Sequence, residues 1–151
     1  MKFFGKSKTK SINKKDKTVL FVCVENAGRS QMAEGFFKKY APTGFTSLSA
    51  GTNPAYHINP VVVEAMKEVG IDISKQKSKE LTEEMIRESD KVVNMGCMNK
   101  NFCPTIWLPK VIDWNLGDPK GKSIEEIKQI RDEIEKKVKE IVAETTTTTQ
   151  I

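Results

Sequence analysis

Short apolar runs alternate with amphipathic stretches along this chain, and the first pair sets the pattern. The run Val19–Val22 is unbroken and rich in β-branched and aromatic residues, which is typical of a strand buried on both faces. From Met32 to Phe37 the apolar residues recur at helical spacing, which predicts a helix that ends near Tyr40. Cys23 ends the strand, so the residues between it and the helix form a tight loop.

The alternation continues towards the end of the chain. Asn59-Pro60 has the pattern of a helix N-cap with a first-turn proline, and Ser123 with Glu126 has the capping-box spacing. The elements expected after the first helix are strands at 45–49, 90–95 and 105–108, and helices at 60–69, 82–89 and from 123 onward. Strands that alternate with helices across short loops predict an α/β fold, here a single domain with a four-stranded parallel sheet flanked by helices.

The formal net charge of +5 is concentrated in one segment. Residues 1–17 carry seven lysines and one aspartate, so this segment contributes +6 and the remaining residues sum to −1. We expect a flexible basic tail over 1–17, one domain over 18–144, and a second flexible tail over 145–151. Because the excess charge lies outside the expected domain, nucleic acid is not an expected partner.

Hydropathy and cysteine usage indicate the compartment. No apolar run approaches the ~20 residues that a membrane-spanning helix needs, and no secretory signal pattern is visible. The three cysteines are an odd count, which suits working thiols in a reducing compartment better than a disulfide framework. The sequence therefore predicts a cytoplasmic protein with no membrane contact, and we expect a monomer.

The loop that follows Cys23 carries the candidate chemistry. The cysteine stands at the carboxyl end of a strand and faces a helix N-terminus, where open α/β sheets bind their ligands. Successive backbone amides can form an anion-binding nest there, and together with the helix dipole they favour a thiolate. Arg29 can grip two oxygens of a tetrahedral oxyanion. The candidate oxyanion-binding residues are Val24, Glu25, Asn26, Ala27, Gly28, Arg29 and Ser30, with the Glu25 carboxylate expected to point outward.

These motifs resemble the low-molecular-weight protein tyrosine phosphatase superfamily, whose signature is Cys-x5-Arg-Ser after the first strand and an Asp-Pro pair late in the chain. Within it the sequence is more similar to the thioredoxin-coupled arsenate reductases. The resemblance covers roughly Thr18 to Val142, and its motifs are CVENAGRS at 23–30 with QMAE following, SAGT at 49–52, GIDIS at 70–74 and Asp118-Pro119. It implies a flavodoxin-like three-layer sandwich.

The resemblance also implies an activity, the reduction of arsenate to arsenite by three cysteines. Cys23 would attack arsenate, or bind phosphate as an analogue, and Cys97 would then attack the Cys23 sulfur and release arsenite. Cys103 would attack Cys97, and thioredoxin would reduce the resulting disulfide. No cofactor would be bound.

Two other functions remain open. A phosphatase acting on phosphotyrosine or small phosphomonoesters would use Cys23 as nucleophile and Asp118 to protonate the leaving oxygen and then activate water. Lys120-Gly121 stands where such phosphatases usually carry aromatic residues, which favours a small inorganic anion. The third reading is a noncatalytic oxyanion-binding or redox-sensing module.

The spacing of the later cysteines restricts their local structure. Six residues on a straight helix rise by ~9 Å, whereas a disulfide needs Cα atoms about 4.4–6.8 Å apart. Residues 96–104 are therefore expected to form a loop, or a helix that unwinds on oxidation.

No metal centre is expected. His57 is the only histidine and has no cysteine or carboxylate at ligand spacing. Asn26, Glu34 and Ser49 resemble positions that hold a monovalent cation in some reductases of the family, and ordinary hydrogen bonds that support the loop would explain them equally well.

Overall fold

The computed structural model describes residues 16–95 and 109–150, and for residues 146–150 it describes the backbone alone. Its sheet has four strands in the order β3-β2-β4-β5, and every neighbouring pair is parallel. The strands are β2 (Lys17–Cys23), β3 (Phe45–Gly51), β4 (Lys91–Asn94) and β5 (Val111–Asp113), and the helices are α2 (Arg29–Tyr40), α3 (Pro60–Glu68), α4 (Glu83–Glu88) and α5 (Ile124–Gln150). The predicted parallel sheet is confirmed.

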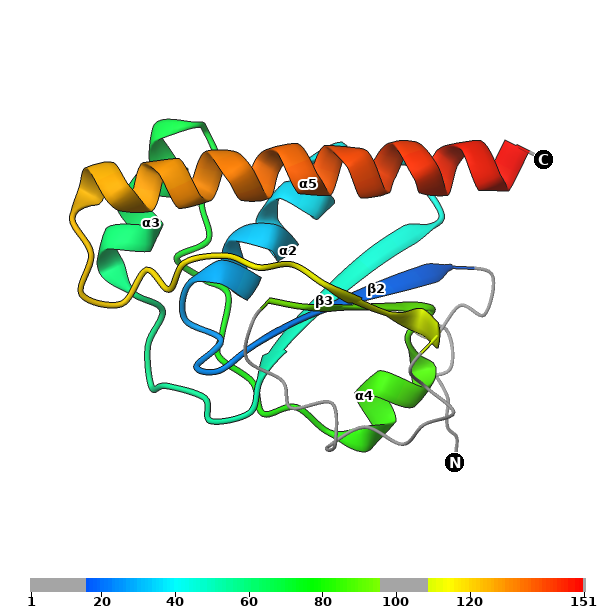
Figure 1. Cartoon of the computed structure of the whole chain (residues 1–151), viewed down its shortest axis with the longest axis horizontal. Coiled ribbons are helices and arrows are strands. Elements are labelled where there is room, and N and C mark those ends of the chain that lie inside the picture. The colour runs from blue at the N-terminus through cyan, green and yellow to red at the C-terminus, as the bar shows by residue number, and fades with distance from the viewer. Residues whose placement is uncertain (1–15, 96–108, 151) are drawn as a thin grey trace, which may run out of the picture.

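Strand β2 lies inside the sheet and separates two cores. Val19, Phe21 and Cys23 pack into the cluster beneath α2, α3 and α5. Leu20 and Val22 point to the opposite face and pack against residues near α4. Figure 1 shows α2, α3 and α5 on one side of the sheet and α4 on the other, which makes the three-layer arrangement that the resemblance implied.

The fourth strand of the described sheet comes later in the chain than the strand expected at 105–108. The predicted strand at 105–108 lies outside the described residues, and the fourth strand of the sheet is β5, whose Val111 pairs with Val92. Only three residues long, β5 lies at the edge of the sheet, and none of its residues is fully buried. It therefore lacks the apolar run that identifies an inner strand.

The ends of the domain also differ from expectation. Lys17 pairs with Phe45 in β2, so the sheet begins one residue before the expected domain, and residues 1–15 lie outside the described part of the chain. The tail expected over 145–151 is helical as far as Gln150, because α5 continues through it. Extending an existing helix adds a hydrogen bond for each residue fixed, and the Thr145 hydroxyl also donates to the Ile141 carbonyl at 2.7 Å.

None of the helices in the described ranges is long and apolar enough to cross a membrane.

Burial of its apolar face stabilises the long helix α5, and Ile134→Ala tests this contribution. Ile134 is fully buried on α5, so its truncation should lower the free energy of unfolding by about 2–5 kcal/mol. Urea unfolding measures the change. Glu133→Ala, on the exposed side of the same turn, should change it by less than about 0.5 kcal/mol. Equal effects of the two substitutions would contradict the assigned helix face.

Candidate active site

One pocket brings together residues that are far apart in the sequence. Cys23 is the last residue of β2 and Arg29 the first of α2, so the loop between them lies at the carboxyl edge of the sheet. The pocket has a volume of about 180 Å³. It is lined by Cys23, Val24, Glu25, Ala27, Gly28, Arg29, Asn59, Asp118, Pro119 and Lys120. The predicted nucleophile, the predicted arginine and the Asp-Pro pair therefore face one cavity.

A short hydrogen-bond chain ends on the Cys23 sulfur. The Ser30 Oγ lies 2.8 Å from the sulfur and accepts a hydrogen bond from Asn26 Nδ2 at 2.7 Å. Because Asn26 supplies one hydrogen to Ser30, the hydroxyl can direct its own hydrogen at the sulfur. A thiolate is a better acceptor than a thiol, so this arrangement favours the reactive form.

Asn26 fixes the middle of the loop. It is fully buried and is the one residue other than glycine with a positive φ, 52°, within the described ranges. Its Oδ1 accepts hydrogen bonds from the Lys79 amide at 2.8 Å and from Gln31 Nε2 at 3.0 Å. Its carbonyl accepts from Gln31 Nε2 at 2.9 Å and from Ser78 Oγ at 2.8 Å. The loop is therefore bound to the segment that precedes α4.

A second segment, residues 52–59, binds the outer side of the same loop through its backbone. The amides of Thr52, Asn53, Ala55 and Asn59 donate to the carbonyls of Cys23, Val24, Glu25 and Ala27 at 2.7–3.2 Å. In a trans peptide the carbonyl and the following amide point in opposite directions. Since these carbonyls face the 52–59 segment, the amides that follow them face away from it, as an anion-binding nest requires.

Two backbone carbonyls orient the Arg29 guanidinium. Its Nη1 donates to the Met95 carbonyl at 2.8 Å and lies 3.5 Å from the Leu116 carbonyl. Its Nη2 lies 3.9 Å from Asp118 Oδ2, and the Asp118 side chain is 60% exposed. The guanidinium is thus buried and oriented, while the carboxyl group lies at the mouth of the pocket, where a proton donor for a departing oxygen is needed.

Glu25 is paired at the mouth of the pocket. Its carboxylate accepts a hydrogen bond from Lys120 Nζ at 2.9 Å, and the lysine side chain is exposed. The hydrogen bond and the charge of Glu25 raise the pKa of Lys120. The pair neutralises the carboxylate that the sequence placed inside an anion-binding loop.

The remaining predicted residues have different outcomes. Cys97 and Cys103 lie outside the described residues. His57 is exposed beside Tyr56, and the described part of the chain holds no group of three or more potential metal-ligating side chains. Glu34 and Ser49 do contact one another, away from the pocket lining.

Sequence reasoning missed several supporting residues. Asn59 was predicted only as a helix N-cap, and its Oδ1 does accept from the Val61 amide at 2.9 Å, yet it also lines the pocket. Gln31 of α2, together with Ser78 and Lys79, hydrogen-bonds to the loop. The 75–79 stretch is polar and has no hydrophobic periodicity, so the sequence gives no reason to expect a role for it. Such contacts cannot be predicted from local pattern, because they form between segments that meet only in the fold.

Comparisons with known proteins show which family and which solved folds this chain resembles. The family model of the low molecular weight phosphotyrosine protein phosphatases matches residues 18–150. The arsenate reductase of Brevibacillus brevis is 40% identical over 126 residues, covering 82% of this chain and 92% of that protein. The solved thioredoxin-dependent arsenate reductase of Corynebacterium glutamicum is 35% identical, with a TM-score of 0.78, and covers 93% of this chain and 67% of that one. The YwlE arginine phosphatase from Geobacillus stearothermophilus is 26% identical, with a TM-score of 0.81, and covers 89% and 96%.

Gly51 is not itself a pocket-lining residue, and Gly51→Ala should disturb the loop from behind. A Cβ at Gly51 would lie 2.5 Å from the Val24 carbonyl and 2.9 Å from the Asn26 amide, so the loop backbone must shift. We expect a loss of about 1–3 kcal/mol in unfolding free energy and weaker phosphate binding, measured by urea unfolding and calorimetry. Gly117→Ala is the matched control, because its nearest contact would be an ordinary 3.6 Å. Unchanged phosphate affinity in Gly51→Ala would contradict the assigned support.

Proposed function

The chain belongs to the low molecular weight phosphotyrosine protein phosphatase family, and we propose that within this family it reduces arsenate to arsenite. The observation that carries the proposal is the shared pocket, in which the Cys23 sulfur, the Arg29 guanidinium and the loop amides surround a cavity of about 180 Å³. A buried nucleophile under converging donors suits a small tetrahedral oxyanion. The identity to arsenate reductases supports arsenate as that oxyanion.

The first step forms a bond between sulfur and arsenic. The Cys23 thiolate attacks arsenic, and one arsenate hydroxyl group takes a proton and leaves as water. Asp118, whose carboxylate lies 3.9 Å from Arg29 Nη2 and is open to solvent, would supply that proton. Arg29 and the loop amides bind the remaining oxygens.

The second step transfers electrons. The Cys97 thiolate attacks the Cys23 sulfur, an S–S bond forms, and the electron pair of the S–As bond stays with arsenic, which becomes arsenite. Cys103 then attacks Cys97 and frees the Cys23 thiolate. Thioredoxin reduces the Cys97–Cys103 disulfide, so no bound cofactor is needed and a reducing compartment such as the cytoplasm suits the cycle.

The role of Cys97 and Cys103 rests on the resemblance to the arsenate reductases, because both cysteines lie outside the described residues. Phosphatase chemistry through Cys23 and Asp118 requires no second thiol, whereas reduction needs thiols that supply two electrons.

Phosphatase activity is the second candidate, and the presence of Asp118 at the pocket mouth favours it. Cys23, Arg29 and Asp118 suffice for phosphoryl transfer to sulfur followed by hydrolysis, and the likeness to an arginine phosphatase fits this reading. The Glu25–Lys120 ion pair occupies the pocket mouth. A charged rim disfavours an aryl phosphate and favours a small inorganic anion.

The decisive assay is NADPH consumption in the presence of arsenate, thioredoxin and thioredoxin reductase. The wild type should turn over, while Cys97→Ser and Cys103→Ser should fall to background because the disulfide cannot be passed on. Hydrolysis of p-nitrophenyl phosphate is the matched control, since any such side activity should survive both substitutions and be lost in Cys23→Ser. Undiminished arsenate turnover in Cys97→Ser would refute the relay.

A further inference from the structure

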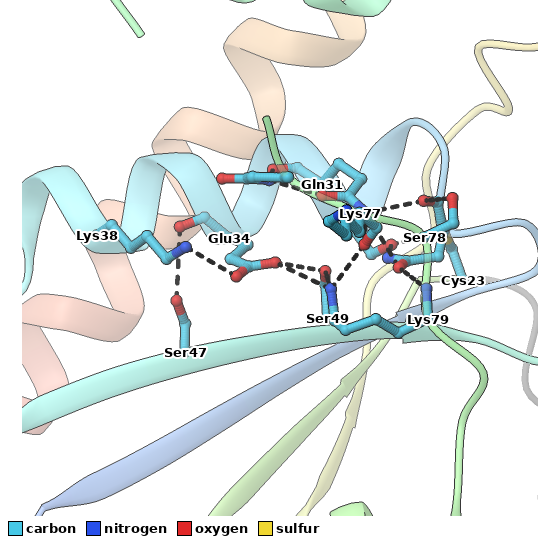
Figure 2. A network of polar contacts seen from close by, with 12 residues as sticks. Cys23, Gln31, Glu34, Lys38, Ser47, Ser49, Lys77, Ser78 and Lys79 are labelled. Carbon is cyan, nitrogen blue, oxygen red and sulfur yellow. Dashed lines mark hydrogen bonds and ion pairs between the residues drawn. The ribbon is translucent and has the colours of Figure 1, made fainter. Parts of the chain in front are cut away.

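A buried carboxylate lies behind the catalytic loop. Glu34, on the face of α2 that meets β3, is 6% exposed. Its Oε1 accepts a hydrogen bond from Ser49 Oγ at 2.5 Å, and Figure 2 shows this carboxylate between Ser49 and two lysine side chains. A buried charge needs a compensating charge, so the two lysines decide how this site is neutralised.

The two lysines approach Glu34 from different surroundings. Lys38 is one turn further along α2, with its Nζ 3.0 Å from Glu34 Oε2, and its side chain is 55% exposed. Lys79 comes from the segment before α4, with its Nζ 3.9 Å from Glu34 Oε1, and its side chain is 33% exposed. Lys38 therefore makes a solvent-screened helical pair, whereas Lys79 links two separate parts of the fold.

The Lys79 ammonium lies among oxygen atoms from three residues. It donates to the Lys77 carbonyl at 2.8 Å and to Ser49 Oγ at 3.4 Å, and it faces the Glu34 carboxylate. Burial lowers the pKa of Lys79, and the negative charge of Glu34 acts in the opposite direction. The surroundings of this ammonium resemble the oxygen shell that a monovalent metal ion would require.

A metal ion does not fit at these positions. The Lys79 ammonium already contacts Glu34 and Ser49, two of the three residues that resemble a cation site. The third, Asn26, uses its Oδ1 for the Lys79 amide and for Gln31. A second cation beside the ammonium would be repelled at short range in a partly buried site.

The same lysine connects this carboxylate to the nucleophile. Its ammonium contacts Glu34, and its own backbone amide donates to Asn26 Oδ1 at 2.8 Å. Asn26 in turn donates to Ser30, whose hydroxyl lies 2.8 Å from the Cys23 sulfur. Figure 2 shows Lys77, Ser78 and Lys79 next to the end of the loop that carries Cys23.

We propose that Lys79 is a built-in cation, whose ammonium replaces a monovalent metal ion beside Glu34 and makes Lys79 a positioning residue for Cys23. The contact between the ammonium and Glu34 fixes segment 77–79. This segment fixes Asn26, and Asn26 positions the Ser30 hydroxyl for its hydrogen bond to the Cys23 sulfur. This role does not depend on whether the pocket reduces arsenate or hydrolyses phosphate esters. Its consequence is a protein whose stability and thiol reactivity are indifferent to potassium.

Thermal unfolding in potassium chloride and in tetramethylammonium chloride of equal concentration tests the built-in cation. The wild type and the exposed control Lys75→Ala should each have the same midpoint in both salts. Lys79→Ala should unfold at a lower temperature in tetramethylammonium, and potassium should raise its midpoint towards the wild-type value. A wild-type protein stabilised specifically by potassium, or a Lys79→Ala protein with no response to potassium, would overturn the proposal.

Alkylation of Cys23 by iodoacetamide, followed peptide by peptide in a mass spectrometer across a range of pH, tests the positioning role. In Lys79→Ala the pH of half-maximal alkylation rate should rise relative to wild type, because the Asn26–Ser30 chain no longer stabilises the thiolate. Potassium should reverse the rise. An unchanged profile would overturn the positioning role, since a merely structural residue would leave it unaltered.

A double-mutant cycle decides the case in which Lys79→Ala does not fold in either salt. Glu34→Gln keeps the hydrogen bond to Ser49 and removes the buried charge. Combined with Lys79→Met, it should give a folded protein whose unfolding midpoint exceeds that of Lys79→Met alone, since the two charges are coupled. A double variant no more stable than Lys79→Met would overturn the proposal.

Discussion

The hydrogen bonds of Asn26 hold the loop on which the rest of the active site depends. Between a strand and a helix, a polar loop is ordinarily the most mobile part of an α/β fold. Here the buried Asn26 binds Gln31, Ser78 and Lys79 through its two oxygens and Ser30 through its amide. Its φ of 52° lies in the left-handed region, which asparagine adopts more readily than most residues. The loop is therefore shaped before any anion arrives.

The residues that fix the shape of the loop are different from the charged residues that would contact the substrate. The 52–59 and 77–79 segments fix the loop backbone, while the charged groups that meet substrate come from elsewhere. Arg29 is oriented by the Met95 carbonyl at the end of β4, and Lys120 compensates Glu25 at the mouth. Electrostatic stabilisation of an oxyanion is strongest when donors need not reorganise, which is the advantage of building the cavity on two packed segments.

The sequence predicted what depends on local pattern. The inner strand at Val19–Val22, the loop after Cys23 and the helix to Tyr40 all follow from hydrophobic spacing, and the structure has them as β2 and α2. The convergence of Arg29 and Asp118 on one pocket could be expected only from the resemblance, because nothing in their spacing brings positions 29 and 118 together.

The features that could not be predicted are those set by tertiary contact. Strand β5 is a short, half-buried edge strand, so its pairing with β4 leaves no apolar run to recognise. Helix α5 extends through a threonine run of low helix propensity because an established helix propagates. Lys79 lies in a polar stretch without periodicity, and its importance comes from the buried Glu34, 45 positions earlier in the chain.

In the proposed reduction, two electrons pass from this chain's own thiols to arsenic in the oxyanion pocket. A single-turnover experiment tests it most directly: fully reduced protein is mixed with excess arsenate in the absence of thioredoxin and of any other thiol. We expect one arsenite for each protein molecule, together with a Cys97–Cys103 disulfide in the quenched protein and a free Cys23. The absence of arsenite, with all three cysteines still reduced after mixing, would contradict it.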